Sequence, residues 1–295
     1  MFLLKLLSRL PLALLYRFSD LMFFLSYSVF RYRRTLVHKN MTRSFPERTE
    51  AEIREVEREF YRNLCDYAVE SLKALTISKH ELKKRFVFIN GDMIREQLSR
   101  GQSVIFLTSH QFNWEWLLLA AGDEYPVTLD FIYQVVSNRF ANDLTLRLRS
   151  RFGAFPVERM QVARACAKRR NIRRGVAMLA DQYPGLGSDK KYDAVFLNQQ
   201  TVFFYGANKL AHMTQYPAYY HYIRKKARGM YEAEAIQIAA PPYPKESSHV
   251  IDTYIRLVEK NIQEYPSNWL WTHNRWKTRH IRRASAQYPP ASTAS

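Results

Sequence analysis

A histidine and a carboxylate stand five positions apart in the stretch Ser109 to Trp116, which reads S-H-Q-F-N-W-E-W. A neutral imidazole can remove a proton from a hydroxyl, and a nearby carboxylate can stabilise the imidazolium that forms. We therefore predict that His110 and Glu115 form a catalytic pair of the kind that suits acyl transfer to an alcohol. The alternative is structural, with His110 as a capping or loop residue and Glu115 as a solvated acid that the helix dipole favours in a first turn.

The segments around this stretch predict how it is positioned. The run Ser103 to Thr108 is short, β-branched and aromatic, which indicates a buried strand. Trp114 to Ala121 has helical length and composition, and Gly122 supplies a stop. His110 is therefore expected where a strand ends and a helix begins, the place at which open α/β sheets form ligand crevices.

A second predicted strand, Val176 to Ala180, also ends in polar residues. Asp181 and Gln182 follow it and precede Pro184 and Gly185, which indicates another crevice edge. Taken alone, Asp181 can equally be a turn acid without chemistry.

Three arginines alternate near the end of a helix that we predict from Asn138 to Arg151. Arg147, Arg149 and Arg151 cannot share one helical face, so at most two of them point at one site. They are either solvated or available to capture phosphate with a guanidinium fork.

Strands and helices alternate along the whole chain, which predicts an α/β fold. The 295 residues suit one large domain. Further helices are expected at 49–75, 93–100, 162–172, 207–213 and 249–264, the first with a capping box of Thr49 and Glu52. Further strands are expected at 86–89, 127–136, 155–157, 217–223 and 230–238, and 201–205 is an apolar run.

The chain is strongly basic, with 45 Lys and Arg against 27 Asp and Glu and a formal net charge of +18. Such a charge implies acidic partners: nucleic acid, anionic lipid or an acidic carrier protein. Aromatic residues make up 14% of the chain, and together with the cations they favour a membrane surface without excluding RNA.

The chain has only two cysteines, Cys65 and Cys166, and no cysteine or histidine cluster has metal-ligand spacing. Neither a disulfide framework nor a zinc site is therefore expected.

Residues 2 to 30 are rich in Leu and Phe but contain charges, and the uncharged run Leu21 to Phe30 is short of the roughly 20 residues of a spanning helix. The segment has no evident cleavage site of small residues, so we do not interpret it as a signal peptide. The segment is either an amphipathic helix in the interface or a marginal span whose arginines snorkel, and an ordinary core helix is the third possibility. The cations that follow, from Arg31 onward, predict that the body lies on the cytoplasmic side.

The stretch Tyr265 to Arg279 alternates aromatic residues with cations. Such a pattern fits either the stacking of bases with contacts to phosphates or a belt at the level of lipid headgroups. No RNA-binding sheet motif, zinc finger or Gly-rich phosphate loop distinguishes the two. The tail after Arg283 is predicted to be disordered.

Several blocks in order resemble the bacterial lipid A biosynthesis acyltransferase family. They are S-H-x-x-N-W-E-W, R-L-R-S-R-F-G at 147–153, R-G-V-A-M-L-A-D-Q-Y-P-G at 174–185, F-F-Y-G at 203–206 and W-T-H-N-R-W-K-T-R at 271–279. The resemblance implies a glycerolipid-acyltransferase-like α/β fold with a central mixed sheet flanked by helices. We expect a membrane-associated segment at 1–34, which also fits that family, an acyltransferase domain at 35–283 and a disordered tail at 284–295.

The family's pattern also assigns roles. His110 is expected to act as general base on the acceptor hydroxyl, with Glu115 in support. Asn113 and Trp114 match the N-W-E signature, Arg149 matches the second-block arginine, and Asp181 and Gln182 match a D-Q pair, so these five are expected to face substrate.

The resemblance further implies the substrates and the location. The donor is a fatty acyl thioester of acyl carrier protein or coenzyme A, and the acceptor is an anionic lipid A precursor at the cytoplasmic face of the inner membrane. No metal, other cofactor or nucleic acid is expected.

One residue departs from that pattern. Phe112 stands where the family commonly has Gly, and its ring is expected to narrow the pocket mouth or change the acyl-chain preference. Two alternatives remain open: an acyltransferase for a phospholipid, aminolipid or other glycolipid, and a basic membrane-attached protein that binds nucleic acid.

Overall fold

A seven-stranded mixed sheet forms the centre of the computed structural model, which describes residues 2–185, 187 and 190–277. Neighbouring strands are parallel except β8 and β9, which form an antiparallel pair. In sheet order the strands are β1 (Phe86–Phe88), β9 (Met230–Ala239), β8 (Ala218–Ala227), β2 (Val104–Thr108), β5 (Arg174–Leu179), β3 (Thr128–Tyr133) and β4 (Phe155–Glu158). The predicted mixed α/β sheet is thus confirmed.

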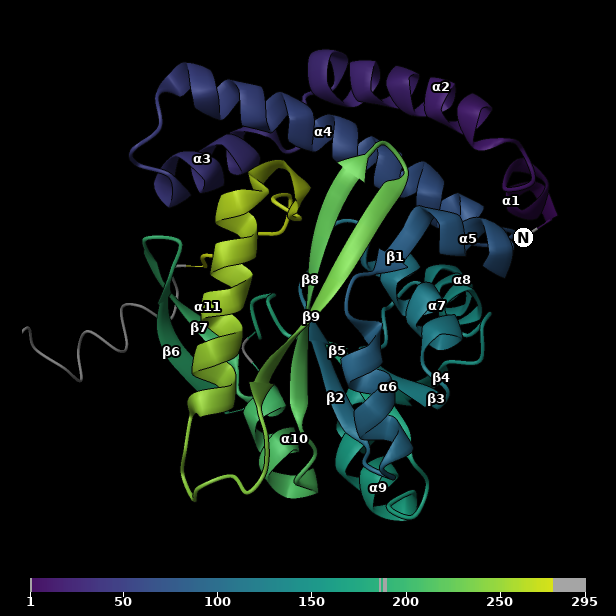
Figure 1. Cartoon of the computed structure of the whole chain (residues 1–295). Helices are drawn as coiled ribbons and strands as arrows, with labels where there is room; N and C mark the ends of the chain where they lie inside the picture. The colour runs from purple at the N-terminus through teal and green to yellow at the C-terminus, as the bar shows by residue number, and fades with distance from the viewer. Residues whose placement is uncertain (1, 186, 188–189, 278–295) are drawn as a thin grey trace, which may run out of the picture.

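Helices cover both faces of this sheet (Figure 1). One face packs against α6 and α7, and the other packs against α10 and α11. The α-helices are α1 (Phe2–Leu7), α2 (Leu12–Phe23), α3 (Arg34–Ser44), α4 (Glu50–Lys73), α5 (Lys79–Arg85), α6 (Gly91–Ser99), α7 (Trp114–Glu124), α8 (Arg139–Arg149), α9 (Val162–Lys168), α10 (Gly206–Thr214) and α11 (His249–Glu264). The alternation of side chains along β2 explains the two layers: Ile105 and Leu107 face one, and Phe106 faces the other.

A separate antiparallel hairpin joins β6 (Lys191–Phe196) to β7 (Gln199–Phe204). The apolar run at 201–205 lies mostly in β7, but the sequence did not predict β6. Its turn residues, Leu197 and Asn198, have φ of 47° and 61°, the left-handed values that two-residue hairpin turns require. Because no glycine occupies this turn, the usual sequence signal for a hairpin was missing.

The N-terminal α2 runs beside α4 (Figure 1) and continues as a π-helix, η1 (Phe24–Val29). The window Leu12–Val29 is long and apolar enough to cross a membrane by length and composition, and only 17% of it is buried. An ordinary core helix would be mostly buried, so that interpretation was wrong. The face toward α4 is held by hydrogen bonds from Ser19 Oγ to Asp66 (2.7 Å) and from the Tyr16 hydroxyl to Glu70 (2.9 Å).

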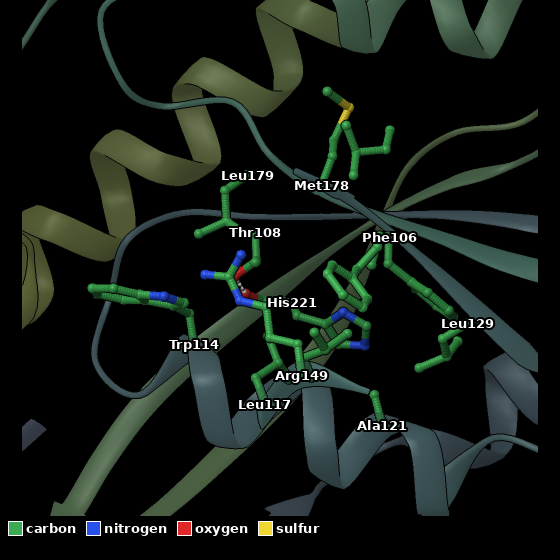
Figure 2. Close-up of a pocket in the computed structure, with 14 residues that line it drawn as sticks. Phe106, Thr108, Trp114, Leu117, Ala121, Leu129, Arg149, Met178, Leu179 and His221 are labelled. Carbon is green, nitrogen blue, oxygen red and sulfur yellow. Dashed lines mark hydrogen bonds between the residues drawn. The ribbon is translucent and has the colours of Figure 1, made fainter. Parts of the chain in front are cut away.

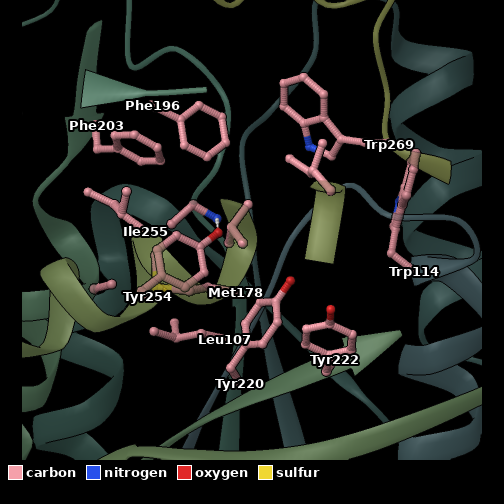
Figure 3. Close-up of a cluster of buried hydrophobic side chains, with 14 of the residues drawn as sticks. Leu107, Trp114, Met178, Phe196, Phe203, Tyr220, Tyr222, Tyr254, Ile255 and Trp269 are labelled. Carbon is pink, nitrogen blue, oxygen red and sulfur yellow. Dashed lines mark hydrogen bonds between the residues drawn. The ribbon is translucent and has the colours of Figure 1, made fainter. Parts of the chain in front are cut away.

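The described part of the aromatic and cationic C-terminal stretch is largely buried. Trp269 is 1% exposed, and Trp271 and Arg275 are fully buried. The two tryptophans pack with residues of the hairpin and α11 in one cluster, part of which Figure 3 shows, and the Arg275 guanidinium lies over the rings of Phe196 and Phe203. They therefore form neither an exposed platform for bases nor a belt at the headgroups, and both expectations are corrected. The predicted tail at 284–295 lies outside the described residues.

Candidate active site

His110 lies in the loop between β2 and α7, as the sequence predicted. Its Nδ1 is 2.7 Å from Oδ1 of Asp181, and its backbone N–H donates to Oδ2 of the same carboxylate at 2.9 Å. The imidazole is 17% exposed. A carboxylate at Nδ1 selects the tautomer that carries its proton there, so the lone pair of Nε2 is available to a substrate.

Asp181 follows β5 and is fully buried. The indole Nε1–H of Trp269 donates to Oδ2 of Asp181 at 2.7 Å. Burial on its own raises the pKa of Asp181, but attraction to His110 and the hydrogen bonds from His110 and Trp269 lower that pKa to about 2. The site thus holds a buried anion directly behind the imidazole.

The C-terminal segment fixes the loop that carries His110. The N–H of Leu270 donates to the carbonyl of His110 at 3.1 Å, and the N–H of Phe112 donates to the carbonyl of Asn268 at 2.8 Å. Sequence reasoning missed Trp269 as a site residue because the alternation around it was interpreted as surface chemistry. The available signal was its place beside the closing W-T-H-N-R-W-K-T-R block.

Glu115 and Arg149 form the second charged pair of the site. Nε and Nη2 of Arg149 donate to the two oxygens of Glu115 at 2.9 and 2.6 Å, a bidentate arrangement. Burial opposes the charge of Arg149, but attraction to Glu115 and their hydrogen bonds raise the pKa of the guanidinium. Glu115 is 5% exposed, so this ion pair is fixed in a poorly hydrated place.

His110 and Glu115 have separate partners among the described residues, and no hydrogen bond joins them there. Trp114 connects the two pairs. Its ring meets the His110 ring edge-on at 4.9 Å, and its Nε1–H donates to Oε1 of Glu115 at 3.1 Å. The structure thus brings both residues of the predicted pair into one cluster, but the carboxylate at His110 Nδ1 is Asp181.

The other predicted site residues differ in their surroundings. Asn113 is fully buried and caps α7: its Oδ1 accepts from the N–H of Trp116 at 3.0 Å, and its Nδ2 donates to Glu70 at 2.8 Å. Its polar atoms are thus used to orient the helix that carries Glu115. Gln182 is partly exposed next to Asp181.

The ring of Phe112 is fully buried in an aromatic stack. It lies 5.1 Å from Tyr67, 5.6 Å from Trp114 and 6.1 Å from Phe60, measured between ring centroids. Phe112 does not line the cavity described next, so the expectation that its ring narrows the pocket mouth directly is wrong. Phe112 stacks on Trp114, which does line that cavity.

A narrow apolar cavity lies between α7 and the sheet (Figure 2). The cavity has a volume of about 40 Å³, so a long ligand enters only if the lining rearranges. Its lining comprises Phe106, Thr108, Trp114, Leu117, Leu118, Ala121, Leu129, Phe131, Ile132, Arg149, Ala177, Met178, Leu179 and His221. In Figure 2, Trp114 lies at one end of this apolar cavity, and Leu129 and Ala121 lie toward the other. The described lining holds no acidic residue, and burial lowers the pKa of its His221 to about 3.

The three alternating arginines separate as their spacing predicted, and Arg147 is exposed to solvent. Arg149 binds Glu115, whereas the guanidinium of Arg151 donates to the backbone carbonyls of Ala74 and Ile77. Arg151 therefore fixes the end of α4.

In the ranges 2–185, 187 and 190–277, no group of three His, Cys, Asp or Glu side chains is arranged to hold a metal ion.

The family model described as bacterial lipid A biosynthesis acyltransferase matches residues 1–278. This match covers the whole of the cluster around His110. A search of curated proteins finds no match to this chain.

Proposed function

Because this chain belongs to the bacterial lipid A biosynthesis acyltransferase family and is therefore an acyltransferase, we propose that it transfers a fatty acyl chain to a hydroxyl of a lipid A precursor. The donor is an acyl thioester of acyl carrier protein or coenzyme A. The observation that carries the proposal is the pair of His110 and the buried anion Asp181, with Nε2 available, next to the apolar cavity.

In the proposed reaction, Nε2 of His110 removes the proton of the acceptor hydroxyl as its oxygen attacks the thioester carbonyl carbon. Asp181 stabilises the imidazolium that results. The tetrahedral oxyanion then collapses, the carbon–sulfur bond breaks, and the imidazolium returns its proton to the leaving thiolate. The products are the lipid ester and the free thiol.

Glu115 has a catalytic part in this proposal through Arg149. The carboxylate binds Nε and Nη2 of Arg149, and the guanidinium also lines the apolar cavity. Its remaining N–H groups are available to the oxyanion, where a fixed positive charge stabilises the transition state. Glu115 thus supports the reaction by holding Arg149, and Asp181 supports it by holding His110.

The acyl chain of the donor is assigned to the apolar cavity. Its mostly apolar lining suits an alkyl chain, and Trp114 and Arg149 close the end nearest the chemistry. Asn113 supports the substrate site by capping α7, and Gln182 faces the acceptor beside Asp181.

The N-terminal segment, 1–34, is assigned to the surface of the inner membrane, and 35–283 forms the catalytic domain on the cytoplasmic side. The contacts of α2 with α4 favour a helix that lies in the interface over one that spans the bilayer. Its outward face exposes large apolar side chains, including Leu14, Phe18 and Leu21. The positive charge of the chain suits an acidic carrier protein and anionic lipid, and no nucleic acid partner is proposed.

The test combines purified full-length protein with lipid A precursor and several acyl thioesters, and reads lipid products by mass spectrometry. His110→Ala is expected to lower transfer by roughly 10³-fold or more, the scale of a lost general base. Circular dichroism should show that this variant still folds. Near-normal transfer by His110→Ala would contradict the proposed role.

Another membrane amphiphile remains the second candidate acceptor, because no residue motif that reads the acceptor was found in the sequence. Lipid A from a strain that lacks this protein distinguishes the two. A lost acyl chain supports lipid A as acceptor, and an unchanged acyl count favours a phospholipid, aminolipid or other glycolipid.

A further inference from the structure

A second, wider cavity opens near the end of β5. Its volume is about 460 Å³, more than ten times that of the apolar cavity. We call it the cationic groove; its lining comprises Ile132, Arg159, Met160, Val162, Ala163, Met178, Lys190, Phe204, Tyr205, Gly206, Lys209, Leu210 and Met213. Ile132 and Met178 line both cavities, so the two meet at the ends of β3 and β5.

Among the described residues that line the groove, every charged side chain is a cation. Arg159, Lys190 and Lys209 are cations, and no acidic residue is among the described residues that line it. Lys190 and Lys209 are exposed to solvent. Several positive charges close together favour an anionic group such as a phosphate.

Two aromatic rings contribute to the same groove. Nζ of Lys190 lies 4.3 Å from the ring centroid of Tyr205, and the guanidinium of Arg159 lies 6.0 Å from that of Phe204. A Cβ at Gly206 would overlap the Phe204 ring, so glycine is required for that ring to pack against the start of α10. The F-F-Y-G block at 203–206 thus places the rings of Phe204 and Tyr205 and the start of α10 at the groove.

Apolar side chains complete the lining. Met160 and Met213 are 67% and 45% exposed, and methionine side chains adapt to irregular apolar ligands. Rings, flexible apolar side chains and cations together match a bulky ligand with a sugar, acyl chains and phosphate.

We propose that the cationic groove binds the acceptor, a phosphorylated glycolipid, with Lys190 and Lys209 as its phosphate-binding residues. This rests on the proposed function, in which two substrates must meet at His110. The donor chain enters the apolar cavity on the α7 face of the sheet, and the acceptor reaches the same strand ends from the α10 side. The competing occupant of the groove is the pantetheine arm of the donor. The KM values for acceptor and donor distinguish the two occupants.

Lys209→Glu is the most informative variant because it reverses a charge at an exposed side chain. We expect the KM for lipid A precursor to rise at least about tenfold, the scale of a lost charge-assisted hydrogen bond, with the donor KM unchanged. Lys84→Glu makes the same charge change on an exposed residue of α5, outside the groove, and should leave both KM values unchanged. An increase in the donor KM instead, or no change in either KM, would overturn the proposal.

A binding measurement separates this proposal from the proposed function. Full-length protein in detergent is titrated with lipid A precursor before and after phosphatase treatment. We expect loss of the phosphate, or Lys190→Glu or Lys209→Glu, to weaken binding at least about tenfold. If neither removal of the phosphate nor the lysine substitutions weakened binding, the groove would not be a phosphate site. Phosphate-dependent binding without acyl transfer would refute the proposed function and leave the groove supported.

Discussion

The two buried carboxylates of the site, Asp181 and Glu115, differ in the groups that bind them. Each accepts a hydrogen bond from an indole N–H, but Asp181 also binds the imidazole of His110, whereas Glu115 binds the permanently charged guanidinium of Arg149. An imidazole gains and loses protons near neutral pH, but a guanidinium does not. The Asp181 site is therefore suited to proton transfer, and the Glu115 site to holding a fixed charge in position.

The largest effect expected from this difference is that of Asp181→Asn. An amide cannot stabilise the imidazolium and can select the wrong tautomer, so kcat should fall on the order of 10³-fold while the acceptor KM changes little. Steady-state kinetics with both substrates measures this. The matched change Glu115→Gln should cost much less, and equal losses in the two variants would remove the distinction between the sites.

Arg149→Lys tests whether the second site works by geometry. Lysine keeps the positive charge but cannot make the two parallel hydrogen bonds that Arg149 makes with Glu115. We expect kcat to fall by roughly 10- to 100-fold, less than removal of an oxyanion donor altogether. Full activity in Arg149→Lys would show that charge alone is enough.

Trp269→Phe removes one donor from Asp181 and keeps an aromatic ring in the core. The lost hydrogen bond goes to a buried anion, so we expect the free energy of unfolding to fall by about 2 kcal/mol and kcat to fall by roughly tenfold. Chemical denaturation and kinetics on the same preparation give both numbers. Unchanged kcat would mean that the His110 bond alone holds the carboxylate.

The smallest effect concerns acid stability. The pKa of Asp181 is lowered from 3.8 to about 2, so its contribution, about 2 kcal/mol, is present above pH 4 and is lost as the pH falls toward 2. The difference in unfolding free energy between wild type and Asp181→Asn should therefore shrink over that range. A difference that stays constant between pH 5 and 2 would contradict the low pKa.

Local patterns predicted most of the elements and the two strand ends that form the site. The capping box of Thr49 and Glu52 lies within four residues of the helix start that it stabilises, and the apolar run from Trp114 lies within α7 itself. Short-range signals of this kind depend little on the rest of the chain, which is why the start of α4 and that of α7 were found correctly.

The pairing within the site depended on contacts that no local pattern contains. Asp181 is 71 residues from His110 in sequence, and Trp269 is 88 residues from Asp181. Glu115 lies nearer to His110 in sequence, but α7 directs it to Arg149 on α8. The C-terminal stretch was predicted to lie at the surface because it is rich in cations. In the structure, Trp269 and Arg275 are buried.

The central claim is that Asp181, and not Glu115, holds Nδ1 of His110. NMR of protein with ¹⁵N-labelled histidine tests it directly, because a hydrogen-bonded Nδ1–H proton gives a resonance far downfield that His110→Ala assigns. We predict that this resonance persists in Glu115→Gln and disappears or moves upfield in Asp181→Asn. Its loss in Glu115→Gln together with its persistence in Asp181→Asn would contradict the account.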